Sequence, residues 1–266
     1  MDTIPKATPD SYLKKGKKQV IEISKLRKRF DSQEVLKDIS FNLHDGENLV
    51  ILGKSGSGKS VLIKCIVRLL KQDEGSITIL GEDINSLDAD KLGELRKKIG
   101  FLFQSGALYD SMTVKQNLEF PLRRIKKDYT ESQIAEKIKE VLENVGLSDA
   151  IDKMPSQLSG GMRKRISLAR TLVVDPLIML YDEPTTGLDP VTSNEISSLI
   201  NEVQKKYKTS SIIITHDIEC AHTTANRIIM LSEGEVYLEG DSKTFENSTD
   251  PLIESFFKQS FSKSKN

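Results

Sequence analysis

The chain has 266 residues, which is enough for one large domain or two smaller ones, and either size leaves ample material for a hydrophobic core. Lys plus Arg and Asp plus Glu each number 39, so the formal net charge is zero and the balance predicts no whole-molecule attraction to nucleic acid or anionic lipid. The two cysteines, Cys65 and Cys220, lack C-x-x-C spacing, which argues against a disulfide framework or a zinc site and fits a reducing cytosol.

The N-terminal residues 1–18 are polar and contain a cluster of lysines, which predicts a disordered basic tail. A solvated charge run and a contact with lipid headgroups both fit this composition. The tail lacks the apolar block of a secretion signal, and no apolar stretch approaches the roughly 18 residues of a spanning helix. We therefore expect a chain that neither crosses a membrane nor is exported by that route.

Alternating apolar residues in QVIEISKL and DISFNL predict strands, and NLVILG predicts a further strand that runs into a glycine-rich turn. A helix is predicted next, in VLIKCIVRLL (61–70), followed by a β segment in SITIL and a charged helix near 91–98. Residues 114–172 then carry helical periodicity almost throughout. This order predicts a small antiparallel β portion near the N-terminus and a helical insert over about 104–172.

From Pro176 the chain alternates between strands and helices: strand LIMLYDEP, a helix over about 190–206, strand SIIIT, a helix, strand RIIMLS, and the hairpin SEGEVYLEG. Apolar strands alternating with helices predict an α/β fold with a mainly parallel sheet covered on both faces. We expect the main domain to span 19–240 and a C-terminal helical extension to span 241–266.

The segment GKSGSGKS fits G-x-x-x-x-G-K-[ST] between a predicted strand and a predicted helix, which is the setting that this motif requires. Its glycines allow backbone amides to surround phosphates, and the helix N-terminus adds its dipole. Lys59 is expected to reach the β and γ phosphates, and Ser60 offers a hydroxyl to Mg²⁺. The pattern predicts a nucleoside triphosphate site formed by Gly53, Lys54, Ser55, Gly56, Ser57, Gly58, Lys59 and Ser60.

Two carboxylates, Asp182 and Glu183, end a predicted strand at the sheet edge where ligands bind in open α/β folds. Asp182 suits the outer shell of a metal, held through water or Ser60, and Glu183 is placed to accept a proton from an attacking water. His216 ends another strand and is predicted to reach the γ-phosphate at the same edge. Solvated acids and a structural histidine are the alternatives.

A second phosphate-binding device is predicted at QLSGGMRKR, where Ser159, Gly160 and Gly161 open a helix. A plain helix cap is the alternative, because Ser is favoured at that position. One γ-phosphate does not need two such sites from the same chain. The second site is therefore expected to bind a phosphate other than the one at the P-loop of the same chain.

The set GKSGSGKS, Gln104, LSGGM, LIMLYDE, GLDP and TH, in this order, resembles the ATPase subunit of an ABC transporter over about residues 20–240. The resemblance implies a P-loop NTPase core, ATP and Mg²⁺ as cofactors, and two copies that dimerise head to tail. Each ATP would lie between the P-loop of one copy and the LSGG segment of the other, which accounts for the second phosphate-binding device.

The resemblance also implies roles for single residues. Lys59 and Ser60 would bind phosphate and Mg²⁺, Gln104 would sense the metal and the attacking water, and Asp182 would support the metal. Glu183 would be the general base and His216 the γ-phosphate switch. The remaining roles fall to Asp189, which would link the two sites across the dimer, and to Phe30, which would stack on adenine or simply join the core.

A narrower resemblance rests on LSGGM, with Met162 in place of the commoner Gln, together with LFQSGALYD and NLEFPLR. These segments are similar to the ATPases of Mla-type systems, which move phospholipids between membranes with an MCE-domain partner. The resemblance implies that the coupling helix of a permease docks on an uncharged segment next to Gln104. That segment comprises Ser105, Gly106, Ala107, Leu108 and Tyr109.

The C-terminal LIESFFKQSF places Leu252, Ile253, Phe256 and Phe257 at helical spacing. Such a helix packs against its own domain or, as the Mla-type resemblance implies, grips the neighbouring ATPase. We assign His44 and His222 to the surface or to packing.

The leading hypothesis is an ATPase subunit on the cytoplasmic face of the inner membrane, which drives a phospholipid permease and has no nucleic acid partner. Another import or export system, or a soluble partner as in iron–sulfur assembly, is the alternative. ABC proteins that act on DNA carry long coiled-coil inserts, and 114–172 is too short for one. A non-hydrolysing ATP-gated module would lack Glu183 or His216.

Overall fold

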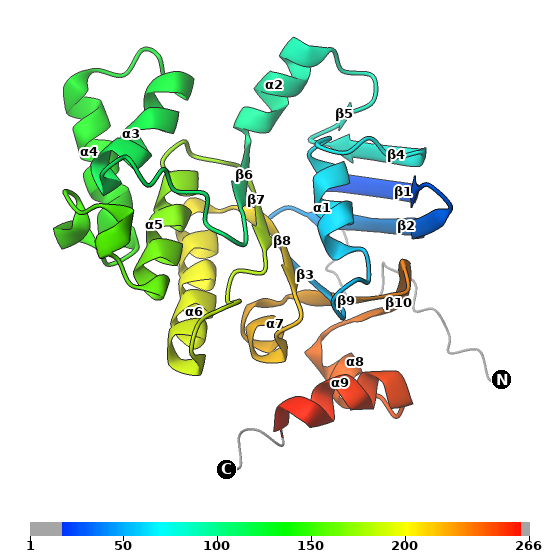
Figure 1. Cartoon of the computed structure of the whole chain (residues 1–266). Helices are drawn as coiled ribbons and strands as arrows, with labels where there is room; N and C mark the ends of the chain where they lie inside the picture. Colours follow the sequence, from blue (N-terminus) through cyan, green and yellow to red (C-terminus); the bar gives the residue numbers. More distant parts are fainter. Residues whose placement is uncertain (1–17, 262–266) are drawn as a thin grey trace.

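The computed structural model describes residues 18–261, and the two ends of the chain lie outside this range (Figure 1). Except for Lys18, the basic tail predicted from the sequence therefore lies outside the described residues. Within them, no helix is both long enough and apolar enough to span a membrane.

An antiparallel sheet near the N-terminus confirms the predicted β subdomain. Its strands are arranged in the order β2-β1-β4-β5 and every pairing is antiparallel. In β1, Ile21 and Ile23 point into the core while Glu22 is exposed, which is the alternation that predicted the strand. The bounds are β1 (Gln19–Phe30), β2 (Gln33–His44), β4 (Glu74–Ile79) and β5 (Glu82–Asp83).

A second, six-stranded sheet in the order β10-β9-β3-β8-β7-β6 forms the centre of the fold. All its pairings are parallel except that of β10 with β9. Parallel strands place their carboxyl ends at one edge, so the segments that follow β3, β6, β7 and β8 meet there. The bounds are β3 (Asn48–Leu52), β6 (Ile99–Leu102), β7 (Ile178–Asp182), β8 (Ser210–Thr215), β9 (Arg227–Ser232) and β10 (Glu235–Gly240).

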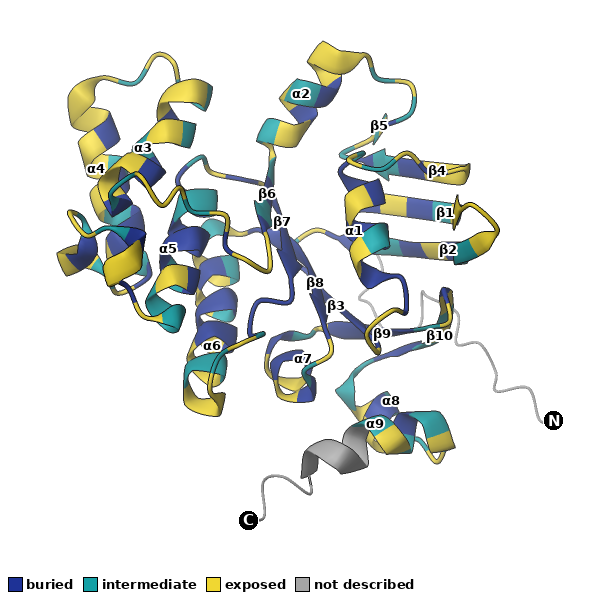
Figure 2. Cartoon of the chain, viewed as in Figure 1, coloured by how far each residue is buried: buried dark blue, intermediate teal, exposed yellow. Residues whose placement is uncertain are grey.

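Helices and the antiparallel sheet cover the two faces of the central sheet, and its strands β3, β7 and β8 are buried at every residue (Figure 2). Val50 and Leu52 of β3 join a core with α5 (Gly160–Leu172), α6 (Pro190–Tyr207) and α7 (Ile218–Thr224). The alternate residues of the same strand, Leu49 and Ile51, join a second core with α1 (Lys59–Ile66), α2 (Ala89–Lys97) and the antiparallel sheet. The alternation along one strand therefore divides the hydrophobic core into two layers.

The helical insert consists of α3 (Val114–Ile125), α4 (Glu131–Asn144) and α5, with two short 3-10 helices, Ser148–Ala150 and Pro155–Gln157. Thr113 and Thr130 each begin a helix with a capping box, completed by Gln116 and Gln133. These caps and the intervening turns divide the helical periodicity predicted over 114–172.

The helix predicted over 61–70 is wrong at its C-terminal end, because α1 ends at Ile66. Arg68 has a φ of 54°, in the left-handed region. Its guanidinium donates hydrogen bonds to the carbonyl oxygens of Ile84, at 2.8 Å, and Leu87, at 2.9 Å. These contacts between distant segments hold the chain in a turn where local periodicity favours a helix.

The C-terminal extension folds into α8 (Ser242–Glu246) and α9 (Pro251–Phe261). Asp250 caps α9 by accepting hydrogen bonds from the amides of Leu252, at 2.8 Å, and Ile253, at 3.2 Å. Ile253 is fully buried, and Leu252 and Phe256 pack against the core on the α6 side of the central sheet. The apolar face of α9 thus packs against its own chain, while the side chain of Phe257 lies outside the described part.

Candidate active site

Lys59, at the end of the glycine-rich turn after β3, donates hydrogen bonds back to the start of that turn. The Lys59 ammonium donates hydrogen bonds to the carbonyl oxygens of Gly53, at 2.7 Å, and Lys54, at 3.0 Å. Gly58 precedes α1 with a φ of 100°, and a Cβ there would lie 2.9 Å from the Val35 carbonyl oxygen. Only glycine suits this position, because both the backbone angle and the close approach exclude a side chain.

A cavity of about 710 Å³ opens over this turn, within the size range of small-molecule sites. It brings together residues that the sequence places far apart, since Gln104, Glu183 and His216 line it together with the turn. From the turn itself the lining includes Lys54, Ser55, Gly56, Gly58, Lys59 and Ser60.

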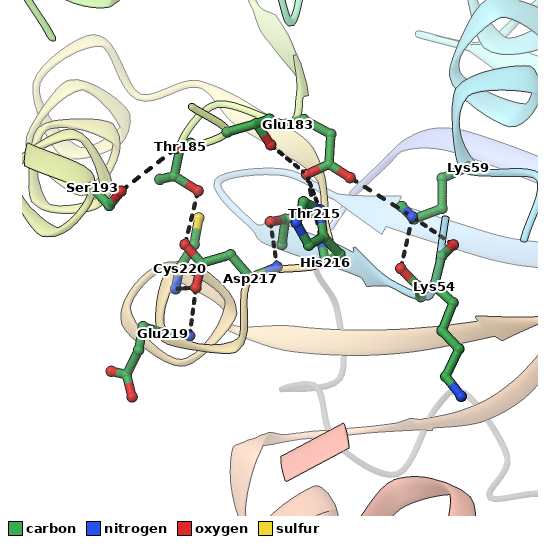
Figure 3. Close-up of polar contacts among 12 residues, drawn as sticks. Lys54, Lys59, Glu183, Thr185, Ser193, Thr215, His216, Asp217, Glu219 and Cys220 are labelled. Carbon is green, nitrogen blue, oxygen red and sulfur yellow. Dashed lines mark hydrogen bonds and ion pairs between the residues drawn. The ribbon is translucent and has the colours of Figure 1, made fainter. Parts of the chain in front are cut away.

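Glu183 lies at the centre of the polar contacts in this cavity (Figure 3). Its Oε1 lies 3.7 Å from the Lys59 ammonium, and its Oε2 lies 2.7 Å from Nδ1 of His216 and accepts a hydrogen bond from the Thr186 hydroxyl at 3.1 Å. The Glu183 backbone has a φ of 51°, a strained conformation for a residue with a side chain. The carboxylate is therefore held by groups from several segments.

Asp182, the last residue of β7, is 8% exposed, and its Oδ1 is buried without a hydrogen-bond partner among the described residues. Burial and the Glu183 carboxylate raise the pKa of Asp182, against the opposing effect of Lys64 and Lys59. A buried carboxylate oxygen without a partner suits a hydrated divalent cation. Carboxylate, hydroxyl and amide oxygens are the ligand types that suit Mg²⁺, so Asp182, Ser60 and Gln104 fit it chemically; Ser60 and Gln104 line the cavity, and Asp182 is outside its described lining.

The segment that carries His216 is fixed between β8 and α7. Thr185 donates a hydrogen bond from its hydroxyl to Oδ2 of Asp217 at 2.9 Å, and Oδ1 of Asp217 caps α7 by accepting from the amide of Glu219 at 3.0 Å. The Asp217 amide donates to the Thr215 hydroxyl at 2.9 Å. Tying this segment to the loop after Glu183 holds the His216 imidazole beside the carboxylate.

Lys164 belongs to this site although no sequence motif indicated it. It is 8% exposed, and its ammonium donates hydrogen bonds to the carbonyl oxygens of Gln104, at 2.5 Å, and Glu183, at 3.4 Å. Burial lowers the pKa of Lys164, and Asp182 and Glu183 oppose this effect. In the sequence, Lys164 is only the middle one of three basic residues, Arg163 to Arg165, in the stretch QLSGGMRKR.

Ser159 begins α5 as its N-cap, where its hydroxyl accepts a hydrogen bond from the Met162 amide at 3.2 Å. Ser159, Gly160 and Gly161 do not line the cavity within the described part of the chain. Asp189 caps α6 in the same way, accepting from the amides of Val191 and Thr192 at 3.1 Å. Ser159 and Asp189 therefore both act as helix N-caps. The contacts of Ser159, Gly160, Gly161 and Asp189 with a second copy stay predictions.

The predicted adenine platform, Phe30, is 43% exposed and is absent from the described cavity lining. The Lys28 ammonium lies 5.4 Å from its ring centroid. An aromatic side chain that does line the cavity comes from α9, where Phe256 has the Lys54 ammonium 5.6 Å from its ring centroid. Helical spacing identified Phe256 as part of an apolar face but did not predict its position beside the glycine-rich turn.

The predicted docking segment is only partly exposed. Gly106 is buried, and a Cβ there would lie 2.5 Å from the Ser167 hydroxyl oxygen, while Leu108 packs against the core. An outward-facing docking segment is therefore contradicted at Gly106, which is buried, whereas Leu108 is only partly buried, and the docking role itself stays a prediction. Tyr109 is 42% exposed and stacks edge-on with Phe120 at a centroid distance of 5.4 Å. Ser105 and Ala107 are also exposed.

The strand order, the glycine-rich turn and the carboxylates at the strand ends define a P-loop NTPase. Residues 36–186 match the ABC transporter family, and the chain belongs to that family. This confirms the ABC ATPase fold and the assignment of the chain as an ATP-binding, ATP-hydrolysing cassette.

Two curated relatives carry transport names. The probable ribonucleotide transport ATP-binding protein mkl of Mycobacterium leprae is 40% identical over 236 residues, which cover 89% of this chain and 68% of that protein. The methionine import ATP-binding protein MetN of Brucella abortus is 37% identical over 237 residues, covering 89% and 64%. The chain thus spans about two thirds of the length of these relatives. Neither name mentions phospholipid, so the Mla-type assignment stays a prediction.

Two solved structures are similar along most of their length. The dimeric post-hydrolysis state of the ATP-binding cassette MJ0796, bound to ADP and Pi, is 33% identical with a TM-score of 0.75, covering 83% of this chain and 98% of that one. The cbiO1 protein of Clostridium perfringens, part of the ABC transporter complex cbiONQ, is 31% identical with a TM-score of 0.80, covering 86% and 91%.

Proposed function

We propose that this chain is the ATPase subunit of an ABC transporter that moves phospholipids between the inner and outer membranes. Its partners would be a second copy of itself, a membrane permease and an MCE-domain protein, and it would sit on the cytoplasmic face of the inner membrane. The cargo assignment is supported by LSGGM, LFQSGALYD and NLEFPLR. The observation that carries the ATPase role is the meeting of Lys59, Glu183 and His216 in one cavity over the P-loop.

In this proposal the P-loop amides and the Lys59 ammonium bind the triphosphate. Mg²⁺ would be held by Ser60, Gln104 and Asp182, and would neutralise phosphate charge when bound. Burial lowers the pKa of Lys59, whereas Glu183 and Asp182 oppose this effect and favour its charged form. A charged lysine in a largely buried position interacts strongly with phosphate, because little water screens it.

Hydrolysis would begin when the Glu183 carboxylate accepts a proton from the attacking water. The contact of Oε2 with His216, at 2.7 Å, orients the carboxylate, and the imidazole would also hydrogen-bond the terminal phosphate. Gln104 would help to orient the water from the segment that follows β6, the strand next to β7. Every member of this set is a polar group that lines the same cavity.

A second copy would complete the site. Ser159, Gly160 and Gly161 form a helix N-terminus suited to an anion, and they do not line their own chain's cavity in its described part. In a head-to-tail dimer they would contact the ATP bound to the partner subunit, and Asp189 would join the two sites. The MJ0796 cassette is dimeric in its ADP- and Pi-bound structure, and the similarity of this chain to it supports the proposal.

Import of a small solute is the second candidate, because the relatives are named for ribonucleotide transport and methionine import. Affinity purification of the tagged chain from detergent-solubilised membranes, followed by identification of the copurified proteins, separates the candidates. A permease together with an MCE-domain protein supports the lipid system. A permease with a solute-binding protein of another kind contradicts it, and a soluble assembly partner contradicts transport altogether.

A further inference from the structure

One face of α5 runs along the segment that begins at Gln104. Lys164, Ser167 and Arg170 are three residues apart in sequence and so lie on neighbouring turns of the same face. The Lys164 ammonium donates to the Gln104 carbonyl oxygen at 2.5 Å, and the Arg170 guanidinium donates to that of Ala107 at 3.0 Å. Between them Ser167 packs against Gly106, where any Cβ would clash. The segment 104–107 is thus fixed to α5 in register.

Lys164 differs from the other two side chains because it makes a second contact. Its ammonium also donates to the Glu183 carbonyl oxygen, at 3.4 Å, so one buried charge joins the segment after β6 to the end of β7. Both carbonyls belong to residues whose side chains line the nucleotide cavity. A buried ammonium strongly favours keeping its hydrogen-bond acceptors in place, because losing them would leave a charge without solvation.

The Glu183 carbonyl lies in a strained part of the backbone, with φ at 51°. Such a conformation persists only where the surrounding contacts hold it. The Glu183 amide donates to the Ile214 carbonyl oxygen at 2.9 Å, and Lys164 holds the carbonyl of the same residue. The backbone that aims the Glu183 side chain is therefore held on both sides, by β8 and by α5.

We propose that Lys164 is a positioning residue that holds Gln104 and Glu183 in their reactive arrangement and links both to the helix that begins at Ser159. This rests on the proposed function of Gln104 and Glu183 in hydrolysis. Lys164 is absent from the described cavity lining, so in this proposal it does not bind the nucleotide directly. It acts through the two carbonyls, so its loss affects the catalytic step and leaves the P-loop contacts with ATP unchanged.

The test compares Lys164→Met, which keeps an unbranched side chain only one atom shorter but has no donor, with Lys164→Arg, which keeps both charge and donors. The kcat and KM of ATP hydrolysis, the equilibrium Kd for ATP and the melting temperature are measured for each. Lys164→Met is expected to lower kcat by about tenfold to a hundredfold, the size of effect that follows a small displacement of reacting groups. The Kd for ATP is expected to stay within about threefold, and Lys164→Arg to restore most of the kcat.

The matched control is Lys139→Met on α4, where the lysine side chain is 76% exposed and pairs with Glu143 at 3.9 Å. It is expected to leave both kcat and Kd unchanged. A wild-type kcat for Lys164→Met overturns the inference. So does a Kd that weakens in proportion to kcat, because this would assign Lys164 to nucleotide binding.

Should Lys164→Met fail to fold, Lys164→Gln is compared with Lys164→Arg. The neutral amide is expected to give the lower kcat, since it lacks the charge that holds both carbonyls, and equal kcat values overturn the inference. Failure of the proposed function has a different outcome, in which the unmodified chain itself does not bind or hydrolyse ATP.

Discussion

The imidazole Nδ1 of His216 lies 2.7 Å from the carboxylate Oε2 of Glu183, and this contact joins the ends of two neighbouring parallel strands, β7 and β8 (Figure 3). The other oxygen of the same carboxylate lies 3.7 Å from the Lys59 ammonium, which follows β3. One carboxylate thus connects segments that follow three strands of the central sheet. Its orientation depends on the sheet rather than on a flexible loop.

Glu183→Gln is expected to lower ATP turnover by about 10²- to 10⁴-fold, because the amide cannot accept a proton from water. ATP binding is expected to persist, since the P-loop is untouched. Phosphate release at saturating ATP and equilibrium binding of ATP measure the two effects. Glu219→Gln is the control, because its side chain points away from the site in Figure 3. A wild-type rate for Glu183→Gln would show that the general base lies elsewhere.

Much of this site was predictable because its residues follow local patterns. A strand, a glycine-rich turn and a helix place Lys59 in any fold that satisfies the motif, and apolar strands carry Glu183 and His216 to a common edge. Periodicity also predicted the antiparallel strands and both sheets. These inferences needed only the order of the elements.

The remaining features depend on contacts between distant segments, which periodicity does not contain. Lys164 reaches Gln104 across 60 positions of sequence, and Arg68 ends α1 through carbonyls beyond β4. The inward packing of Gly106 depends on Ser167, and the place of Phe256 beside Lys54 depends on how α9 docks. In each case the tertiary contact decides what a local pattern leaves open.

Substitutions in the exposed part of the docking segment are expected to impair binding of the permease without impairing binding of ATP. Ala107→Glu together with Tyr109→Glu is expected to release the permease, because charge would enter an apolar contact, while ATP binding is retained. Copurification with membranes and ATP binding are the measurements. Normal membrane association of this variant would contradict the docking role.

Gly106→Ala tests the inward packing of the same segment. The φ of Gly106 is 80° and a Cβ would lie 2.5 Å from the Ser167 hydroxyl oxygen, so the variant is expected to lose stability by about 1–3 kcal/mol. Urea unfolding measures this loss. A stability equal to that of the unmodified chain would show that the segment is free to move away from α5.

A buried ion network closes the side of the fold opposite the cavity edge. Arg227 is 1% exposed and donates from Nε to Oε1 of Glu47 at 2.8 Å, with further hydrogen bonds to Glu239 and the Asn42 carbonyl oxygen. A buried charge of this kind is stable only while its partners keep the opposite charge. Protonation of the carboxylates would therefore weaken the network.

This network predicts a pH dependence of stability. Burial raises the pKa of Glu47, but hydrogen bonding and charge from Arg227 outweigh it and leave the pKa below its usual value of 4.5. A carboxyl group whose pKa is lower in the folded state than in the unfolded state stabilises the fold at pH values above the unfolded-state pKa. That stabilisation is lost as the pH falls through the folded-state pKa. Unfolding free energy is therefore expected to drop as the solution is acidified below about pH 4.5. Glu47→Gln should reduce this dependence, and an unchanged acid profile in that variant would contradict the assignment.

The packing of α9 against its own chain gives a final prediction. It distinguishes this arrangement from one in which α9 contacts only the partner subunit. Ile253 is fully buried, so Ile253→Ala is expected to lower the unfolding free energy by about 2–5 kcal/mol even at concentrations where the chain is monomeric. Leu177→Ala, at a residue that is 54% exposed, is the control and should change little. A loss of stability that appears only when the protein dimerises would mean that α9 is held by the partner subunit. A loss of stability that is independent of protein concentration would show that α9 packs against its own chain. This agrees with Phe256 of α9, which lines the nucleotide cavity of the same chain.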